Sequence, residues 1–181
     1  MPKTKLEEAI QFALDAHEGH LRKGDHPLPY FVHLIDVLHK VRLIGGVMDE
    51  DALCAAVLHD TLEDTDVTPE QLEERFGPKV RLLVVQLTRR TSKQSEDHYS
   101  AMLLEDIAHM HPDAQRIKLA DRLANLWESS RTRPQERTRK YAEEALKMLE
   151  IIPKDTAPTL WAAVDAFSRE CIAQAQKSHG K

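Results

Sequence analysis

Apolar residues recur at intervals of three and four along nearly the whole chain, which is the spacing of one face of an α-helix. No alternating run of apolar and polar residues is long enough to predict a β-strand. We therefore expect an all-α protein, a bundle of about eight to ten helices. The ranges predicted to be helical are 5–18, 31–43, 49–60, 68–77, 79–87, 96–110, 112–130, 134–151 and 155–177.

Local signals mark the ends of these helices. Gly19 and the glycine pair at 45–46 each follow the last apolar position of a periodic segment, where glycine commonly ends a helix. Asp49 and Thr68 precede such segments and are predicted N-caps, and a proline in the first turn strengthens the second one. The segment 19–30, which contains glycine and two prolines, is expected to be an ordered loop.

Neither an internal repeat nor an interdomain linker interrupts the pattern. The polar segment 88–95 is expected to be a mobile loop inside one domain. We expect residues 1–181 to form a single domain, with its motifs in a core of about 5–150 and a C-terminal helix at about 155–177.

Composition narrows the class of protein. Hydrophobic residues make up 41% and charged residues 30% of the 181 residues, as in ordinary globular domains. A net charge of −5 gives no electrostatic reason to expect nucleic-acid binding, and no apolar run is long enough to cross a membrane. The start of the chain does not resemble a signal peptide, so we expect a cytoplasmic protein in which Cys54 and Cys171 are buried free thiols. The oligomeric state stays open.

The chemistry concentrates in the segment VLHDTLEDT, residues 57–65. Adjacent His59 and Asp60 at the end of an apolar helix could bind one metal ion, and imidazole with carboxylates suits Mn²⁺, Fe²⁺, Zn²⁺ or Ni²⁺. A helix-capping aspartate beside a core histidine is the alternative for this pair alone. Glu63 and Asp64 lie one turn further on and would stand beside the metal if the helix continued.

Two further residues strengthen the interpretation of His59 and Asp60 as metal ligands. His33 opens a predicted helix, and Asp121 lies within the apolar pattern of another. A carboxylate among apolar neighbours is costly to bury unless a cation meets it, and that cation could be a metal, Arg122 or a lysine. Asn125, one turn on, shares the face of Asp121.

The order His33, His59-Asp60, Asp121 resembles the ligand pattern of the HD phosphohydrolase superfamily. Residues 17–33, with Arg22-Lys23 and Pro29-Tyr30, are similar to the first conserved motif of the (p)ppGpp hydrolase domains of RelA/SpoT proteins and of stand-alone, Mesh-type alarmone hydrolases. LHDTLEDT at 58–65 and KLADRLANL at 118–126 resemble two further signatures of these hydrolases, and the resemblance covers roughly residues 5–150.

The resemblance implies an HD-domain helical bundle and a role for each matching residue. His33, His59, Asp60 and Asp121 would bind one Mn²⁺, and Glu63 and Asp64 would orient and deprotonate the attacking water. Substrate contacts would come from Arg22, Lys23, Asn125 and Tyr141. The implied activity is metal-dependent hydrolysis of the 3′-pyrophosphate of ppGpp or pppGpp, with a small-molecule nucleotide as the partner.

Two departures bear on the substrate. Leu34 replaces the proline that usually follows the first histidine, and Trp127 replaces an arginine after the asparagine motif. The alternatives are therefore a phosphatase acting on NADPH or another nucleotide, and a nucleotide-binding regulator without catalysis. The basic run 131–140 lacks interleaved aromatic residues and is followed by acids, so we interpret it as a solvated helix boundary.

Overall fold

A computed structural model describes residues 2–23, 27–89 and 96–179. In these ranges the secondary structure is helical apart from an isolated bridge between Leu21 and Pro29. The prediction of an all-α fold is therefore confirmed. The helices are α1 (Lys5–Ala16), α2 (Phe31–His39), α3 (Glu50–Leu58), α4 (Thr61–Asp64), α5 (Pro69–Phe76), α6 (Pro78–Leu87), α7 (Glu96–His109), α8 (Pro112–Thr132), α9 (Gln135–Ile151) and α10 (Pro158–His179).

The predicted caps are confirmed. The Asp49 side chain accepts a hydrogen bond from the backbone N–H of Ala52 (2.9 Å) at the start of α3. Thr68 and Gln71 form a capping box at the start of α5, in which each side chain accepts a bond from the other's backbone N–H. These bonds satisfy N–H groups that have no partner within the helix.

Several predicted helix ends differ from the structure. The last helix begins at Pro158, after a 3₁₀ turn over Lys154–Thr156 (η2). The first helix ends at Ala16, before Gly19, and the second passes from α2 into a π-helical turn over Lys40–Ile44 (η1). The predicted helix 49–60 ends at Leu58, and a new short helix, α4, begins at Thr61. Residues 90–95 of the loop expected to be mobile lie outside the described residues.

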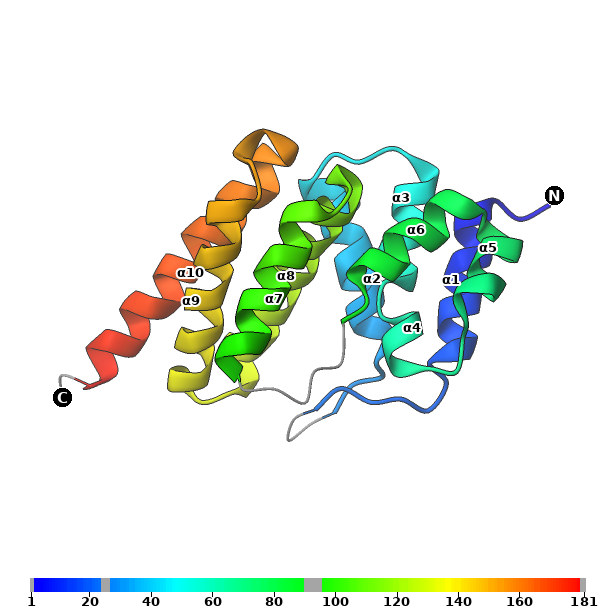
Figure 1. The fold of residues 1–181 in the computed structure, drawn as a ribbon. Coiled ribbons are helices and arrows are strands. Elements are labelled where there is room, and N and C mark those ends of the chain that lie inside the picture. The colour runs from blue at the N-terminus through cyan, green and yellow to red at the C-terminus, as the bar shows by residue number, and fades with distance from the viewer. Residues whose placement is uncertain (1, 24–26, 90–95, 180–181) are drawn as a thin grey trace.

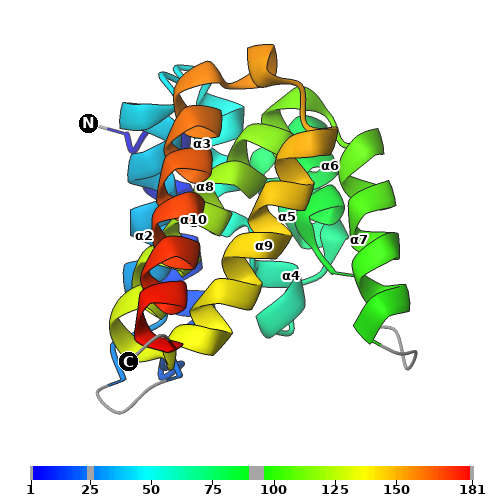
Figure 2. The same cartoon turned by 90° about the vertical axis from the view of Figure 1, so that its left-hand side faces the viewer.

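α8 is the central helix of the bundle (Figure 1) and packs against α2, α3, α6, α9 and α10. Its stretch Ile117–Ala124 is buried at every position, so it has no solvent-facing stripe there. Figure 2 shows α9 and α10 side by side as an antiparallel pair on one flank, while α1 and α5 lie on the opposite flank in Figure 1. Any polar side chain in the middle of α8 therefore faces the interior of the molecule.

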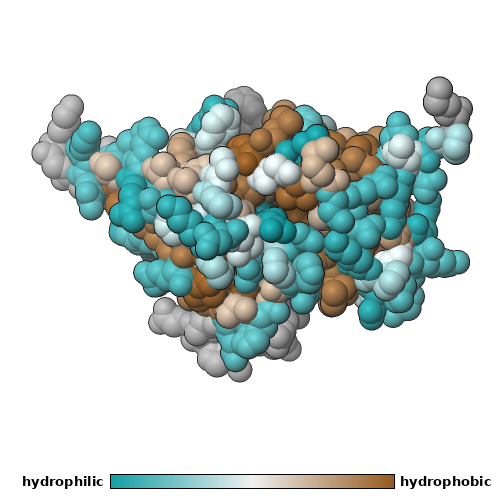
Figure 3. Space-filling view, turned by 90° about the horizontal axis from the view of Figure 1, so that it is seen from above, coloured by the Kyte–Doolittle hydropathy of each residue, from teal (hydrophilic) through white to brown (hydrophobic). Residues whose placement is uncertain are grey.

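The core is aliphatic, and polar side chains dominate the surface. The largest fully buried side chains include Phe76, Leu119 and Leu160, and the buried Cys54 and Cys171 are free thiols, as predicted. Seen from above, apolar patches lie between larger hydrophilic areas (Figure 3). Among the described residues, no helix combines the length and apolarity needed to cross a bilayer.

Candidate metal centre and substrate pockets

Four side chains from three separate elements converge beside the middle of α8. His33 lies in the first turn of α2, His59 and Asp60 form the turn between α3 and α4, and Asp121 lies in α8. His33, His59 and Asp60 each offer a ligand atom, and these atoms lie within 4.8 Å of one another. The four predicted metal ligands are therefore neighbours in space, although they are far apart in sequence.

Distances between ring nitrogens and carboxylate oxygens define the centre of this cluster. Nε2 of His33 lies 3.3 Å from Oδ1 of Asp121 and 3.5 Å from Oδ2 of Asp60. Nε2 of His59 lies 3.0 Å from the same Asp60 oxygen and 3.8 Å from Oδ1 of Asp121. Both histidine nitrogens thus point at the same two carboxylates.

The tautomer of His59 suits a metal ligand. Nδ1 of His59 lies 2.9 Å from the carbonyl oxygen of Ala56, which can only accept, so this nitrogen carries the proton and Nε2 presents a lone pair. Nε2 of His33 and of His59 are buried and have no hydrogen-bond partner of good geometry within the described residues. Buried polar atoms normally find a partner, and a metal ion at the centre of the cluster would supply it.

Electrostatics also favours a cation at this position. Burial lowers the pKa of His33, but its contacts with Asp121 and Asp60 outweigh burial and raise the pKa to about 9. Without a metal ion, His33 is therefore protonated at neutral pH, and it would lose this proton on binding one. Burial raises the pKa of Asp60 and Asp121, yet the histidines, and Lys118 near Asp121, hold both values below the ordinary range. Both carboxylates are consequently anionic at neutral pH and available as ligands.

Of the side-chain cations proposed for Asp121, the lysine is near and the arginine is not. Nζ of Lys118 lies 3.7 Å from Oδ2 of Asp121, one turn earlier on α8. The guanidinium of Arg122 lies over the ring of Tyr141 instead, 3.9 Å from its centroid, and bonds to Glu144 (3.4 Å). Of the two side-chain alternatives for the partner of Asp121, the structure therefore favours the lysine.

Tyr30 supports the cluster from the loop before α2. Its hydroxyl donates to Oδ2 of Asp60 (2.7 Å), and its ring stacks on the buried imidazole of His17 at 5.0 Å between centroids. Burial and the two carboxylates of Asp60 and Asp64 raise the pKa of Tyr30, so the hydroxyl keeps its proton. No role was predicted for Tyr30 itself. Because it lies three residues before His33, at the start of α2, the two side chains are on the same side of the helix, and this spacing could have indicated its role.

Glu63 and Asp64 lie on α4, directly after the cluster. The helix does not continue through His59, so the condition for shared faces with the metal ligands is not met. Both side chains are exposed. Glu63 accepts a hydrogen bond from the backbone N–H of Arg89 (3.3 Å), and Asp64 lies close enough to Tyr30 to affect its pKa. Two solvent-accessible carboxylates therefore stand at the rim of the cluster.

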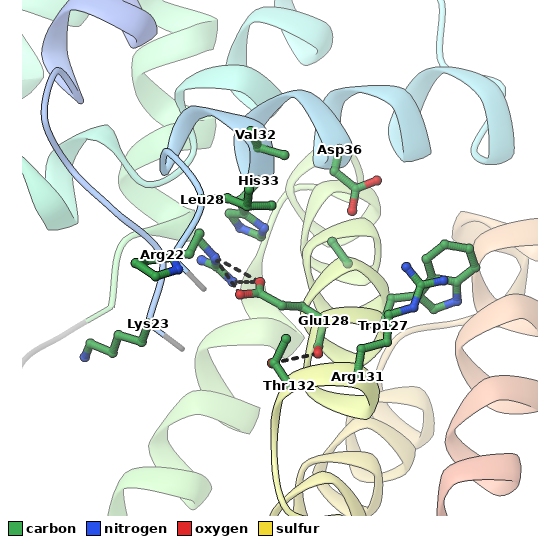
Figure 4. A pocket seen from close by; sticks show the side chains of 12 residues that line it. Arg22, Lys23, Leu28, Val32, His33, Asp36, Trp127, Glu128, Arg131 and Thr132 are labelled. Atoms are coloured by element: carbon green, nitrogen blue, oxygen red, sulfur yellow. Dashed lines mark hydrogen bonds and ion pairs between the residues drawn. The ribbon is translucent and has the colours of Figure 1, made fainter. Parts of the chain in front are cut away.

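Arg22 lies between the cluster and α8 in a network of hydrogen bonds. Its Nε donates to both carboxylate oxygens of Glu128 (3.2 and 2.9 Å), and its Nη2 donates to Oδ1 of Asn125 (2.7 Å) and to Glu128. The amide of Asn125 in turn donates to Asp121. The Lys23 side chain lines the neighbouring pocket (Figure 4), and its carbonyl accepts a bond from Arg133 (3.0 Å).

Two pockets meet at Arg22. The first pocket, about 400 Å³, lies between α2 and α8 and is lined by apolar side chains that include Leu28, Val32 and Trp127. The second pocket, about 180 Å³, lies between α8 and α9. Among the residues lining the second pocket are Arg22, Asn125, Arg133, Arg137 and Tyr141.

The basic run 131–140 spans the boundary between α8 and α9, and most of its residues are exposed, as predicted. Arg133 and Arg137 also line the second pocket, which contains the predicted substrate residues Asn125 and Tyr141. Their place beside Arg22 results from the packing of α8 against α9, so the sequence did not indicate it.

The two departures from the family pattern lie in different environments. Leu34 is fully buried in α2 and belongs to the core. Trp127 is 46% exposed and lines the first pocket. Nζ of Lys40 lies 5.4 Å and the Arg131 guanidinium 4.7 Å from the centroid of its indole ring, so two cationic side chains lie against this ring.

Comparison with known proteins agrees with this geometry. The chain matches the HD domain family over residues 9–149. It is 35% identical to the human guanosine-3′,5′-bis(diphosphate) 3′-pyrophosphohydrolase MESH1 over 150 residues, which is 81% of this chain and 83% of the human one. It is also 35% identical to the Drosophila melanogaster MESH1 over 173 residues, covering 93% and 96% of the two chains.

A solved structure shares the fold. It is described as a metazoan ortholog of SpoT that hydrolyses ppGpp and has a role in starvation responses. It superposes with a TM-score of 0.84 at 32% identity and covers 94% of this chain and 97% of its own. The matched length, the identity and the shared fold show that this chain belongs to the HD domain family, among the MESH1-type guanosine-3′,5′-bis(diphosphate) 3′-pyrophosphohydrolases.

Proposed function

We propose that this protein hydrolyses the 3′-pyrophosphate bond of ppGpp or pppGpp and releases GDP or GTP and pyrophosphate. The observation that carries the proposal is the cluster of His33, His59 and Asp60, whose two unpartnered ring nitrogens face anionic carboxylates beside two pockets. The relatives named as 3′-pyrophosphohydrolases support this reaction over the NADPH phosphatase and over the non-catalytic regulator.

The residues present fit a divalent metal, and we propose Mn²⁺ held by His33, His59, Asp60 and Asp121. Such an ion, when bound, would lower the pKa of a water molecule and offset the negative charge that develops on the phosphoryl group. Nitrogen and oxygen donors with no sulfur are suited to Mn²⁺. Tyr30 and Asn125, which bond to Asp60 and Asp121, would hold the two carboxylates in place.

We assign proton transfer to Glu63 and Asp64. Both residues are exposed on α4, which begins directly after the proposed ligand Asp60. A positioned carboxylate that takes the proton of the attacking water contributes typically about 10²–10⁴-fold in rate. Arg89, whose backbone N–H bonds to Glu63, would orient that side chain.

We propose that the nucleotide lies across the two pockets on either side of Arg22. The guanidinium of Arg22 offers a flat surface for the base, Lys23 offers a point charge for phosphate, and Asn125 and Tyr141 line the same region. An overall negative protein can bind a polyanion in this way, because the positive charge is concentrated locally.

Incubation of the purified protein with ppGpp and Mn²⁺, with GDP and pyrophosphate measured as products, tests the activity. We expect turnover in the wild type and its loss in Asp121→Ala. Release of inorganic phosphate in place of pyrophosphate would contradict the proposed bond cleavage. Unchanged turnover in Asp121→Ala would contradict the proposed metal site.

We further propose that the chain acts as one HD domain in the cytoplasm. The pair α9–α10 packs on α8, the helix that carries Asp121, so the C-terminal helix belongs with the motif-bearing core. Two buried free thiols suit a reducing compartment. Fluorescence microscopy of the tagged protein and a single cooperative unfolding transition are the expected readouts.

A further inference from the structure

Glu128 places a carboxylate where an anionic substrate must bind. It lines both pockets beside the metal cluster, together with Arg22 and Thr132 (Figure 4). A negative charge at this point repels phosphate groups and therefore weakens binding of a polyanion. Its presence is explained only if it does something that outweighs this repulsion.

The hydrogen bonds between Glu128 and its partner Arg22 indicate what this role is. Glu128 engages Nε and Nη2 of Arg22 side by side, and Nη2 also bonds to Asn125. These bonds use three of the five guanidinium N–H groups, and the Nη1 edge takes no part in them. A paired arginine edge of this kind is fixed in its plane and cannot use the same edge to grip a phosphate.

The guanidinium of Arg22 packs against an aromatic ring. It lies over the ring of Tyr30, with 5.1 Å between the guanidinium carbon and the ring centroid. Among the described residues, Arg22, Glu128 and Thr132 line both pockets, so the Arg22–Glu128 pair lies where the two pockets meet.

The same arginine is linked to two of the proposed metal ligands. Through Asn125 it reaches Asp121, and through the Tyr30 ring it lies over the side chain that donates to Asp60. A guanidinium free to swing would lose the bond to Asn125 and the contact with Tyr30 at once.

We propose that Glu128 is a positioning residue for substrate binding, which holds the Arg22 guanidinium fixed in its plane where the two pockets meet. This inference rests on the proposed function, because it assumes that the nucleotide binds against Arg22. Glu128 itself makes no bond to the substrate in this scheme and acts only through Arg22.

The substitution Glu128→Gln tests the proposal through the sign of its effect. If the carboxylate were only a negative charge in the site, its removal would lower the KM for ppGpp. If it positions Arg22, KM rises about tenfold, the loss expected for a charge-assisted hydrogen bond, while kcat stays within about threefold. Glu143→Gln, which removes the same charge from an exposed ion pair with Arg139 on α9, is the matched control and leaves both constants unchanged.

A double-mutant cycle gives the second measurement. In an Arg22→Ala background, Glu128→Gln should no longer raise KM and should instead lower it slightly, because only the repulsion remains. Arg22→Lys keeps the charge but loses the planar edge, and should raise KM to the same degree as Glu128→Gln. Additive effects of the two single substitutions, or a fall of KM in Glu128→Gln, would overturn the positioning role.

These outcomes are distinct from a failure of the proposed function. Absence of ppGpp turnover in the wild type with Mn²⁺ would refute the function itself. Turnover in the wild type with an unchanged KM in Glu128→Gln would leave the function intact and refute only the inference. Thermal unfolding of each variant, expected within a few degrees of the wild type, verifies that the variants are folded.

Discussion

Asp121 lies in the most buried part of the central helix α8, where its neighbours determine its charge. Its carboxylate is enclosed by α2, α3 and α8 and meets His33, Lys118 and Asn125. Burial alone would protonate such a group, and the surrounding donors keep its pKa low instead. An anionic oxygen is thus maintained in the interior, where its attraction for a cation is strong because little water screens it.

The two rim carboxylates are expected to act in the chemical step and not in metal binding. Glu63→Gln and Asp64→Asn should each lower kcat by about 10²–10⁴-fold, because the attacking water loses its proton acceptor. Binding of Mn²⁺, measured by calorimetry, should change less than threefold in either variant.

Asp66→Asn is the control for this prediction, since Asp66 is exposed and lies just beyond α4. It should keep wild-type kcat. A rim variant that keeps full kcat would remove that residue from the mechanism.

The buried thiols should be unreactive in the folded protein. Burial raises the pKa of Cys54 to about 12 and also raises that of Cys171. At pH 8 the thiolate fraction of Cys54 is therefore very small, and reagents have no access to it. Ellman's reagent should label native protein over hours and protein in denaturant within minutes; rapid labelling at pH 8 without denaturant would contradict the burial of these residues.

At the scale of elements, the π-helical turn at Lys40–Ile44 connects α2 to the core. The backbone N–H of Gly45 bonds to the carbonyl of Lys40 (2.9 Å), five residues back, and the turn brings Gly45 against α10. A Cβ at position 45 would lie 2.6 Å from the carbonyl oxygen of Val41 and 2.8 Å from a methyl group of Leu160. The close approach of the chain to α10 therefore requires glycine.

Gly45→Ala should consequently destabilise the protein by about 1–3 kcal/mol, as overpacking typically does. Gly46→Ala tests a different cost, because position 46 has open space but a φ of +65°. That substitution should cost about 1–2 kcal/mol through backbone strain alone. Urea unfolding at equilibrium measures both, and a Gly45→Ala protein as stable as the wild type would show that the π-turn can relax.

Much of this element structure follows from local sequence, and the exceptions have physical causes. Caps such as Asp49 and Thr68 depend on neighbours three residues away, so they could be predicted. The break at His59 and the π-turn after α2 depend on packing between helices, and no local residue announces them. Arg133, Arg137 and Glu128 lie near Arg22 only because segments far apart in the sequence pack together.

The candidate cluster could also be predicted from the sequence only in part. Histidine and aspartate beside each other in VLHD suggested a metal site, and the apolar neighbours of Asp121 indicated a buried charge. The family resemblance predicted that the four residues form one site, and the structure places them close together. Tyr30, which bonds to Asp60, had no chemical signal in the sequence beyond its position before His33.

At the scale of the whole molecule, the cluster joins elements that otherwise form two flanks. α2 and α3 lie toward α1, while α8 connects them to the pair α9–α10 (Figure 1). An ion that needs all of these segments docked together binds the folded state and not the unfolded one. The metal is therefore expected to stabilise the fold as well as to serve the reaction.

Addition of Mn²⁺ to protein freed of metal by EDTA should raise Tm. At a concentration 100 times the dissociation constant the gain is about 2.7 kcal/mol, which corresponds to roughly 5–10 °C for a domain of this size. Differential scanning calorimetry measures the shift. Asp121→Ala should show none, whereas Glu143→Gln should show the wild-type shift; an equal rise in Asp121→Ala would place the stabilising ion elsewhere.

The spacing of the cluster along the chain has a consequence for folding experiments. His33, the pair His59-Asp60 and Asp121 come from separate helices, and no short stretch of the chain carries more than the adjacent pair. High-affinity binding therefore requires that α2, the α3–α4 turn and α8 are docked at the same time. The rate at which a colorimetric chelator gives up its metal ion during refolding would therefore measure the rate of this docking, since the ion leaves the dye only after the last of the three segments has docked.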